Sequence, residues 1–258
     1  MAEPLLLSSG KRELVIDPPL MNAAGTLGFG TEASGWVALD HLGAFVTNPL
    51  SRRRRSPAAD AGVLATPAGF LLHNGLPNPG LTAGLRLPSP GADRLPRIVH
   101  LIGNPAAELE RMILAAESHE QVAAIEIGLE QPDPSLLKAV GHLVRGAELP
   151  VILRLGLDEA DESFVRAAEA GCHALSFGPA RGSLAQGAGM FRGRLYGPAV
   201  FPLALAKLER LRPQVDCQLI AAGGITHRQA AHTLLDAGAD ALQLDSILWL
   251  DPKEVLPL

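Results

Sequence analysis

The sequence predicts an α/β fold, a (β/α)8 TIM barrel with a short N-terminal β-hairpin. Short apolar runs alternate along the chain with longer amphipathic segments, which is the pattern of repeated strand–helix units. Eight of these runs are apolar almost without interruption, as expected for parallel strands that are buried on both faces. The length of 258 residues is that of one such barrel, about 250 residues. We therefore expect residues 1–258 to form a single barrel domain.

The predicted strands begin after a hairpin over residues 5–16. The eight predicted barrel strands are Leu20–Ala23, Ala44–Thr47, Ile98–Ile102, Ala123–Ile127, Val151–Leu155, Ala174–Phe177, Gln218–Ala221 and Ala241–Leu244. Because parallel strands need crossover connections, the segments between them should form right-handed βαβ units.

The predicted helices lie between the later strands, at about residues 104–117, 133–146, 158–170, 198–212 and 226–237. Thr226 is the expected N-cap of the last helix, since a hydroxyl accepts a hydrogen bond from the first helical turn. Gly171 and Gly238 follow two of the helices, where a left-handed residue commonly ends a helix.

Two long segments interrupt the alternation. Leu50–Pro96 is rich in Pro and Gly, and Gly178–Gly197 contains six glycines without apolar periodicity. We expect both to be loops, and His73–Gly80 within the first is typical of a turn-rich lid. A loop that long inside a compact domain is usually functional.

Composition excludes several classes of protein. A net charge of −5 argues against general nucleic-acid binding, and no apolar run approaches the ~20 residues of a membrane span. The N-terminus lacks a secretory signal, so we expect a cytoplasmic protein. Two cysteines, Cys172 and Cys217, cannot form a disulfide framework, and both precede strands on the face opposite the active site. We assign no metal ligands.

Candidate catalytic residues follow from strand positions, because barrels place their active sites at the C-terminal ends of the strands. His100 and Arg154 would face one another across the mouth if both point inward. Alternatively, Arg154 forms a buried ion pair with Glu126 on the adjacent strand. The sequence supports the two arrangements equally.

Charged and glycine-rich motifs give further candidates. Gly223 and Gly224 lie in a turn that runs into a helix, a geometry in which backbone N–H groups hold phosphate. The alternative is a tight turn without a ligand. The run Arg52–Arg55 is best interpreted as a solvated face, and attraction of an anionic ligand to the mouth is the alternative.

Five segments resemble, in chain order, the motifs of the class 1 dihydroorotate dehydrogenases, which are FMN-dependent barrels of pyrimidine synthesis. The segments are residues 22–30, 43–48, 69–80, 193–198 and 222–225. The resemblance implies FMN, a small-molecule substrate and a homodimer. The cofactor-binding positions that it implies are Ala23, Ala24, Gly25, Asn48, Gly197, Gly223, Gly224 and Ser246, and the implied substrate-binding residue is Asn78.

The catalytic positions of that family are changed in this chain. The family's lysine at the end of the second strand is Asn48, and its fifth-strand lysine is Arg154. The loop with the catalytic cysteine reads Gly128–Asp133 here and contains no cysteine. The Gly-Thr pair that helps to hold phosphate is Asp245-Ser246, which places a negative charge beside a phosphate. A base for proton abstraction must then come from Glu130 or His100.

Other substitutions remove amides that bind orotate in the family. The loop asparagine aligns with Leu72, the third-strand asparagine with His100 and the sixth-strand asparagine with Ser176 or its neighbours. Arg154 restores part of the lost positive charge, with a different shape.

Three hypotheses are consistent with these residues. The first is an FMN-dependent oxidoreductase that converts dihydroorotate to orotate, or acts on a related substrate, with an altered active site. The second is a catalytically inactive or non-flavin ligand-binding or partner barrel. The third is a lyase or isomerase for a phosphate-bearing ligand that uses His100, Glu130 and Arg154.

Overall fold

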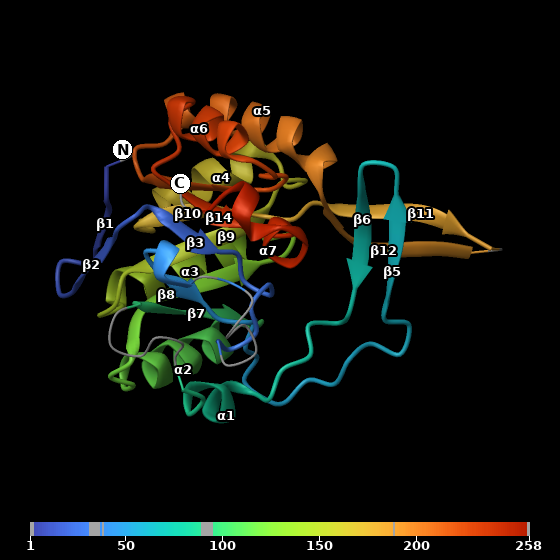
Figure 1. Ribbon diagram of the computed structural model, residues 1–258. Coiled ribbons are helices and arrows are strands. Elements are labelled where there is room, and N and C mark those ends of the chain that lie inside the picture. Colours follow the sequence, from blue (N-terminus) through green and yellow to red (C-terminus); the bar gives the residue numbers. More distant parts are fainter. Residues whose placement is uncertain (1–2, 31–36, 38, 89–94, 188, 257–258) are drawn as a thin grey trace.

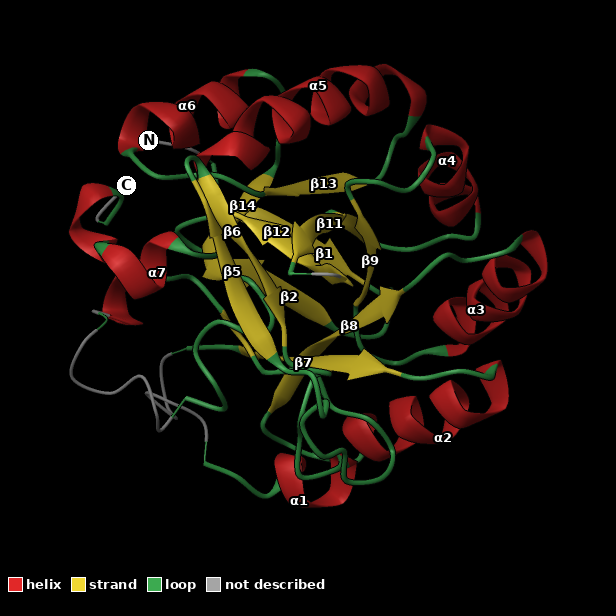
Figure 2. Cartoon of the chain, turned by 90° about the vertical axis from the view of Figure 1, so that its right-hand side faces the viewer, coloured by secondary structure: helices red, strands yellow, loops and turns green. Residues whose placement is uncertain are grey.

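In the computed structural model, residues 3–30, 37, 39–88, 95–187 and 189–256 are described, and among them eight parallel strands form a nearly closed barrel (Figures 1 and 2). The strands lie in the order β3-β14-β13-β10-β9-β8-β7-β4. Their bounds are β3 (Leu20–Asn22), β4 (Phe45–Val46), β7 (Arg97–Ile102), β8 (Val122–Leu129), β9 (Val151–Gly156), β10 (Ala174–Gly178), β13 (Gln218–Ala222) and β14 (Ala241–Leu244). The predicted fold class is confirmed.

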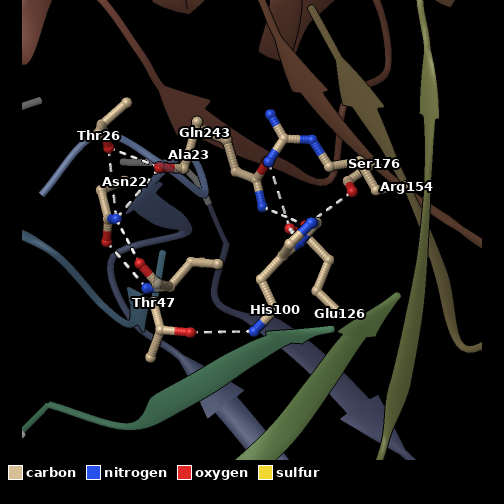
Figure 3. A network of polar contacts seen from close by, with 10 residues as sticks. Asn22, Ala23, Thr26, Thr47, His100, Glu126, Arg154, Ser176 and Gln243 are labelled. Atoms are coloured by element: carbon tan, nitrogen blue, oxygen red, sulfur yellow. Dashed lines mark hydrogen bonds and ion pairs between the residues drawn. The ribbon is translucent and has the colours of Figure 1, made fainter. Parts of the chain in front are cut away.

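Asn22 joins the two ends of the barrel sheet. Its Oδ1 accepts a hydrogen bond from the backbone N–H of Val46 at 2.9 Å, and its Nδ2 donates to the carbonyl of Val46 at 2.6 Å (Figure 3). An isolated bridge between Met21 and Ala44 lies beside this contact. A side-chain amide thus supplies the pairing that the short strand β4 lacks.

Helices surround the barrel (Figure 2). They are α1 (Leu81–Leu85), α2 (Ala106–Glu117), α3 (Pro134–Gly146), α4 (Asp161–Glu169), α5 (Phe201–Leu211), α6 (Arg228–Asp236) and α7 (Ile247–Leu250). Short 3-10 turns occupy Leu39–His41, Pro198–Val200, Arg212–Gln214 and Pro252–Glu254.

The predicted helix ends are partly correct. Gly171 and Gly238 have φ of 91° and 100°, so both are the left-handed residues that follow helices. The N-cap of α6 is His227, not Thr226, because the His227 side chain accepts the N–H of Ala230. Helix α4 begins at Asp161, later than predicted.

The N-terminal hairpin is confirmed as β1 (Leu5–Ser8) paired with β2 (Glu13–Ile16). Its alternate residues are buried and pack with apolar side chains from the barrel strands, among them Met21 and Ile98. The hairpin therefore covers the barrel at the end opposite the mouth (Figure 1).

The two long segments are not loops, which corrects that prediction for their described residues. Their strands β5 (Gly62–Thr66), β6 (Gly69–His73), β11 (Arg181–Gln186) and β12 (Gly189–Tyr196) form an antiparallel sheet in the order β11-β12-β6-β5. The sheet projects from the barrel (Figure 1) and lies over its mouth (Figure 2). The central pairing joins segments more than 100 residues apart, with Arg194 opposite Leu72, so local sequence patterns cannot reveal it.

Gly193 lets β12 approach β6, and its replacement tests this pairing. A Cβ at Gly193 would lie 2.7 Å from the carbonyl oxygen of Leu72, whereas a Cβ at Gly189 in the same strand meets no atom closer than 3.9 Å. We expect Gly193→Ala to lower the free energy of unfolding by about 2 kcal/mol, because the strands must separate. Gly189→Ala is the control, and urea unfolding measures both. Equal midpoints for the two variants would show that the approach carries no strain.

Candidate functional site

Five strands of the barrel contribute to a buried polar network around Glu126 (Figure 3). The Glu126 carboxylate is 0% exposed and contacts His100 Nδ1 at 2.6 Å. Ser176 Oγ donates to it at 2.8 Å and Gln243 Nε2 at 2.6 Å. Arg154 donates through Nη1 at 3.4 Å. These residues come from β7, β8, β9, β10 and β14, so the closed barrel itself assembles the network.

The charges in the network follow from its contacts. Burial acts to raise the pKa of Glu126, but the charge of Arg154 and the hydrogen bonds from His100 and Gln243 outweigh it and lower the pKa to about 2. Burial lowers the pKa of His100, against the opposing effect of Glu126. At neutral pH the pair is therefore a carboxylate and a neutral imidazole, in which Nδ1 carries the proton that bonds Glu126.

The second ring nitrogen of His100 lies on the side of the barrel mouth. A Cβ at Gly128 would lie 2.7 Å from this Nε2, so the glycine leaves the nitrogen uncovered. With Nδ1 protonated, Nε2 carries a lone pair and can accept a proton. The arrangement resembles other carboxylate–imidazole pairs in which the acid fixes the tautomer of the base.

Of the two arrangements that the sequence left open, the structure contains the ion pair between Arg154 and Glu126. His100 contacts the same carboxylate oxygen. Glu126 thus brings the two predicted residues together.

Glu130 lies at the edge of the mouth. Its side chain is 58% exposed and forms an ion pair with Arg194 of β12. Glu130, His100 and Arg154, the predicted catalytic residues, line one cavity of about 60 Å³ together with Arg194 and Tyr196.

A second cavity of about 620 Å³ lies between the projecting sheet and the barrel. It shares Ala24, Leu76, Glu130, Arg194 and Tyr196 with the small one. Its charged lining residues are Arg55, Asp60, Glu130, Arg181, Arg192 and Arg194, and His73 also faces it.

The arginines of the large cavity differ in their contacts. Arg181 is held by Asp158 and Glu159, each at 2.6 Å. Within the described ranges, the exposed side chains of Arg55 and Arg192 have no hydrogen bond or ion pair. Their guanidinium groups are free to bind an anion.

Asn78, the predicted substrate-binding residue, lines neither cavity. Its Oδ1 accepts hydrogen bonds from the N–H groups of Ser51 and Gly80, and its Nδ2 donates to the carbonyl of Leu76. The side chain is buried and joins the turn at Leu76–Gly80 to Ser51. Both ends of its amide therefore bond to the chain itself.

Comparison with known proteins identifies the family. No family model matches the chain. The chain is 30% identical over 260 residues to a protein of Geotalea daltonii, an alignment that covers 91% of this chain and 85% of that protein. It is 31% identical to a protein of Geobacter sulfurreducens, covering 91% and 84% of the two chains. Both relatives are named dihydroorotate dehydrogenase B (NAD(+)), catalytic subunit. The chain belongs to the dihydroorotate dehydrogenase family.

A third relative agrees with this assignment. A protein of Desulforudis audaxviator with the same name is 29% identical, over 93% of this chain and 85% of its own length. The resemblance that the sequence motifs indicated is therefore confirmed.

The residues that the family resemblance assigns to FMN lie in two environments. Ala24 and Gly25 line the large cavity. Asn48 has a buried Oδ1 without a hydrogen-bond partner, so this atom can accept an N–H group from a ligand. The remaining assigned residues are buried by the chain itself: Ala23, Gly197, Gly223, Gly224 and Ser246.

The predicted phosphate turn already holds an anion. The Asp245 carboxylate accepts hydrogen bonds from the N–H and the hydroxyl of Ser246, and the N–H of Gly224 also interacts with it. Asp245 is only 5% exposed, and burial raises its pKa against the effect of these hydrogen bonds and of Arg154. Three donors near the turn, the N–H and hydroxyl of Ser246 and the N–H of Gly224, thus contact the chain's own carboxylate.

An aromatic cluster of Phe70, Tyr196 and Trp249 includes a residue that lines the small cavity. Tyr196 stacks on Phe70 with ring centroids 5.5 Å apart and packs against Trp249 at 5.6 Å. Trp249 Nε1 donates to the carbonyl of Thr26. Burial raises the pKa of Tyr196, whose ring lies within the fields of both Arg154 and Asp245. The side chains present therefore do not fit FMN in the family's manner.

Sequence reasoning did not assign site roles to Gln243 and Tyr196. It considered Glu126 only as an ion-pair partner and Asp245 only as a negative charge beside a phosphate. A signal was present for two of them, because Glu126 and Gln243 are polar residues inside otherwise apolar strands. Such a residue must find partners inside the barrel.

The remaining predictions concern metals, membranes and cysteines. Among the described residues there is no cluster of metal-ligating side chains, and no helix is long and apolar enough to cross a membrane. Cys172 and Cys217 are free and precede β10 and β13, at the end of the barrel away from the mouth.

Proposed function

We propose that this chain is a non-flavin member of the dihydroorotate dehydrogenase family that binds a small organic anion in the cavity over the barrel mouth. The observation that carries the proposal is the pair of unpartnered guanidinium groups, Arg55 and Arg192, in a cavity of about 620 Å³. Guanidinium groups bind carboxylates through paired, charge-assisted hydrogen bonds. The volume is within the range of small-molecule sites.

The chemistry at the floor of the site supports proton transfer. His100 Nε2 is a proton acceptor that Glu126 fixes in one tautomer, and Arg154 supplies a positive charge beside it. A substrate would enter from the large cavity, past the boundary that Glu130, Arg194 and Tyr196 form between the two cavities. Arg55 and Arg192 would orient the anion, and His100 Nε2 would hold the proton that the substrate gives up.

Anion binding is tested by titrating the purified protein with orotate and other small carboxylates, with heat of binding as the readout. We expect Arg192→Gln to weaken binding about tenfold, because one charge-assisted contact of roughly 1.5 kcal/mol is lost. Arg53→Gln is the matched control, since Arg53 is exposed, carries the same charge and lies outside the cavity. Failure of every carboxylate to bind, or equal weakening in both variants, would contradict the proposal.

FMN-dependent oxidation of dihydroorotate, or of a related substrate, is the second candidate. Family membership and the unpartnered Oδ1 of Asn48, which could accept the ring N–H of a flavin, favour it. The relatives' names refer to NAD(+) and to a catalytic subunit, so an electron acceptor and a partner subunit belong to this candidate. Visible absorbance after incubation with FMN decides between the two. Flavin bands that dihydroorotate bleaches without oxygen would establish this candidate instead of the first.

Four predictions from the resemblance and the composition are retained as proposals. We propose a cytoplasmic homodimer, with all 258 residues in one domain and no affinity for nucleic acid. Light scattering after size-exclusion chromatography measures the oligomeric state.

A further inference from the structure

We propose that Asp245 is a built-in substitute for the phosphate group of a cofactor, and that this one carboxylate makes the chain reject phosphate-bearing ligands at the turn after β13. The inference rests on the proposed function in that both assume a mouth without FMN. It adds the residue that determines this specificity.

The strand register places Asp245 beside the turn. Strands β13 and β14 are parallel neighbours, with Ala222 opposite Gln243. Gly223 and Gly224 follow Ala222, while Asp245 lies two residues after Gln243, so both segments leave the sheet at the same edge. The register of β13 and β14 therefore positions the Asp245 carboxylate beside the turn.

The hydrogen bonds are those that an anion would receive. The Ser246 N–H and hydroxyl donate to Asp245 Oδ1, and the Gly224 N–H interacts with the same carboxylate. Oriented N–H groups in a glycine turn before a helix constitute a phosphate-binding arrangement. Here an internal anion satisfies them, so no donor among these groups is left for an external one.

Displacement of Asp245 by a phosphate is disfavoured for two reasons. The carboxylate is covalently tethered and 5% exposed, so it competes at a high local concentration. A phosphate beside it would also place two negative charges in a buried space, and the repulsion opposes binding. Tyr196 adds a second barrier, because its buried side chain fills space beside the small cavity at the mouth.

The test compares FMN with riboflavin, which lacks only the phosphate, in matched double variants. Tyr196→Ser opens the ring space in both variants. The double variant Tyr196→Ser/Asp245→Gly should bind FMN at least about tenfold more tightly than riboflavin, since the freed donors of Ser246 and Gly224 contact the phosphate. The double variant Tyr196→Ser/Asp245→Asn should bind the two flavins equally, because asparagine fills the same space as Asp245. Quenching of flavin fluorescence measures the four affinities.

The wild-type chain provides a test that does not depend on the variants' folding. It should show no preference for FMN over riboflavin, and inorganic phosphate should not raise its melting temperature. The same phosphate should raise the melting temperature of Asp245→Gly. No gain from either glycine variant overturns this proposal alone, since neither variant changes Arg192 or the anion-binding cavity. A wild-type preference for FMN overturns it together with the non-flavin assignment. Loss of carboxylate binding without an FMN preference contradicts only the anion-binding proposal.

Discussion

Replacing Glu126 with alanine is expected to lower the free energy of unfolding by about 4 kcal/mol, because it leaves the buried charge of Arg154 without a partner. Arg154 is 7% exposed, and Ser176 and Gln243 would also lose the acceptor of their hydrogen bonds. Urea unfolding followed by circular dichroism measures the loss.

Glu130→Ala is the matched control for this experiment. It also removes a carboxylate from an arginine ion pair, but at a side chain that is 58% exposed. Exposed pairs contribute about 1 kcal/mol or less. If the two alanine variants were equally stable, the network around Glu126 would not stabilise the barrel.

The same carboxylate makes stability depend on pH. The pKa of Glu126 falls from 4.5 to about 2 in the folded chain. A lowered pKa means that the folded state favours the carboxylate, so this stability is present above pH 4.5 and is lost as the pH falls toward 2. The shift corresponds to about 3 kcal/mol. The free energy of unfolding should differ less between pH 6 and pH 3 in Glu126→Gln than in the wild-type chain. The same difference in both chains would refute the lowered pKa of Glu126.

Replacing Arg97 with alanine is the second large effect, with an expected loss of about 4 kcal/mol, since a large buried side chain and charged hydrogen bonds are removed together. Arg97 is 1% exposed and donates to the carbonyls of Gly84, Leu85 and Leu87 at 2.8–3.3 Å. These carbonyls belong to α1 and the residues after it. The guanidinium thereby ties the segment between β6 and β7 to the barrel.

Two further variants separate charge from geometry at Arg97. Arg97→Lys keeps the charge but lacks the planar fork, so we expect about half of the loss. Arg86→Ala removes an exposed arginine at the end of α1 and should change stability by less than about 0.5 kcal/mol. Urea midpoints in the order Arg86→Ala, Arg97→Lys, Arg97→Ala, from most to least stable, are the expected result. Equal stability of Arg97→Ala and Arg86→Ala would contradict it.

The site shows where sequence reasoning stops. The rule that barrels act at the ends of their strands found His100 and Arg154, and both line the mouth. The rule gives positions along a strand, not partners across the barrel. The contact of both side chains with Glu126, and of Asp245 with Gly224, depends on strands that are distant in sequence.

The sequence by itself determined the barrel, its strand order along the chain and the N-terminal hairpin, because continuous apolar runs and periodic helices are local properties. Only the tertiary structure decided that Leu50–Pro96 and Gly178–Gly197 contribute a common sheet, since β6 and β12 pair across more than 100 residues. It also decided which groups occupy the turn at Gly224. A carboxylate and a phosphate compete for the same N–H donors, and the barrel's register gives those donors to Asp245.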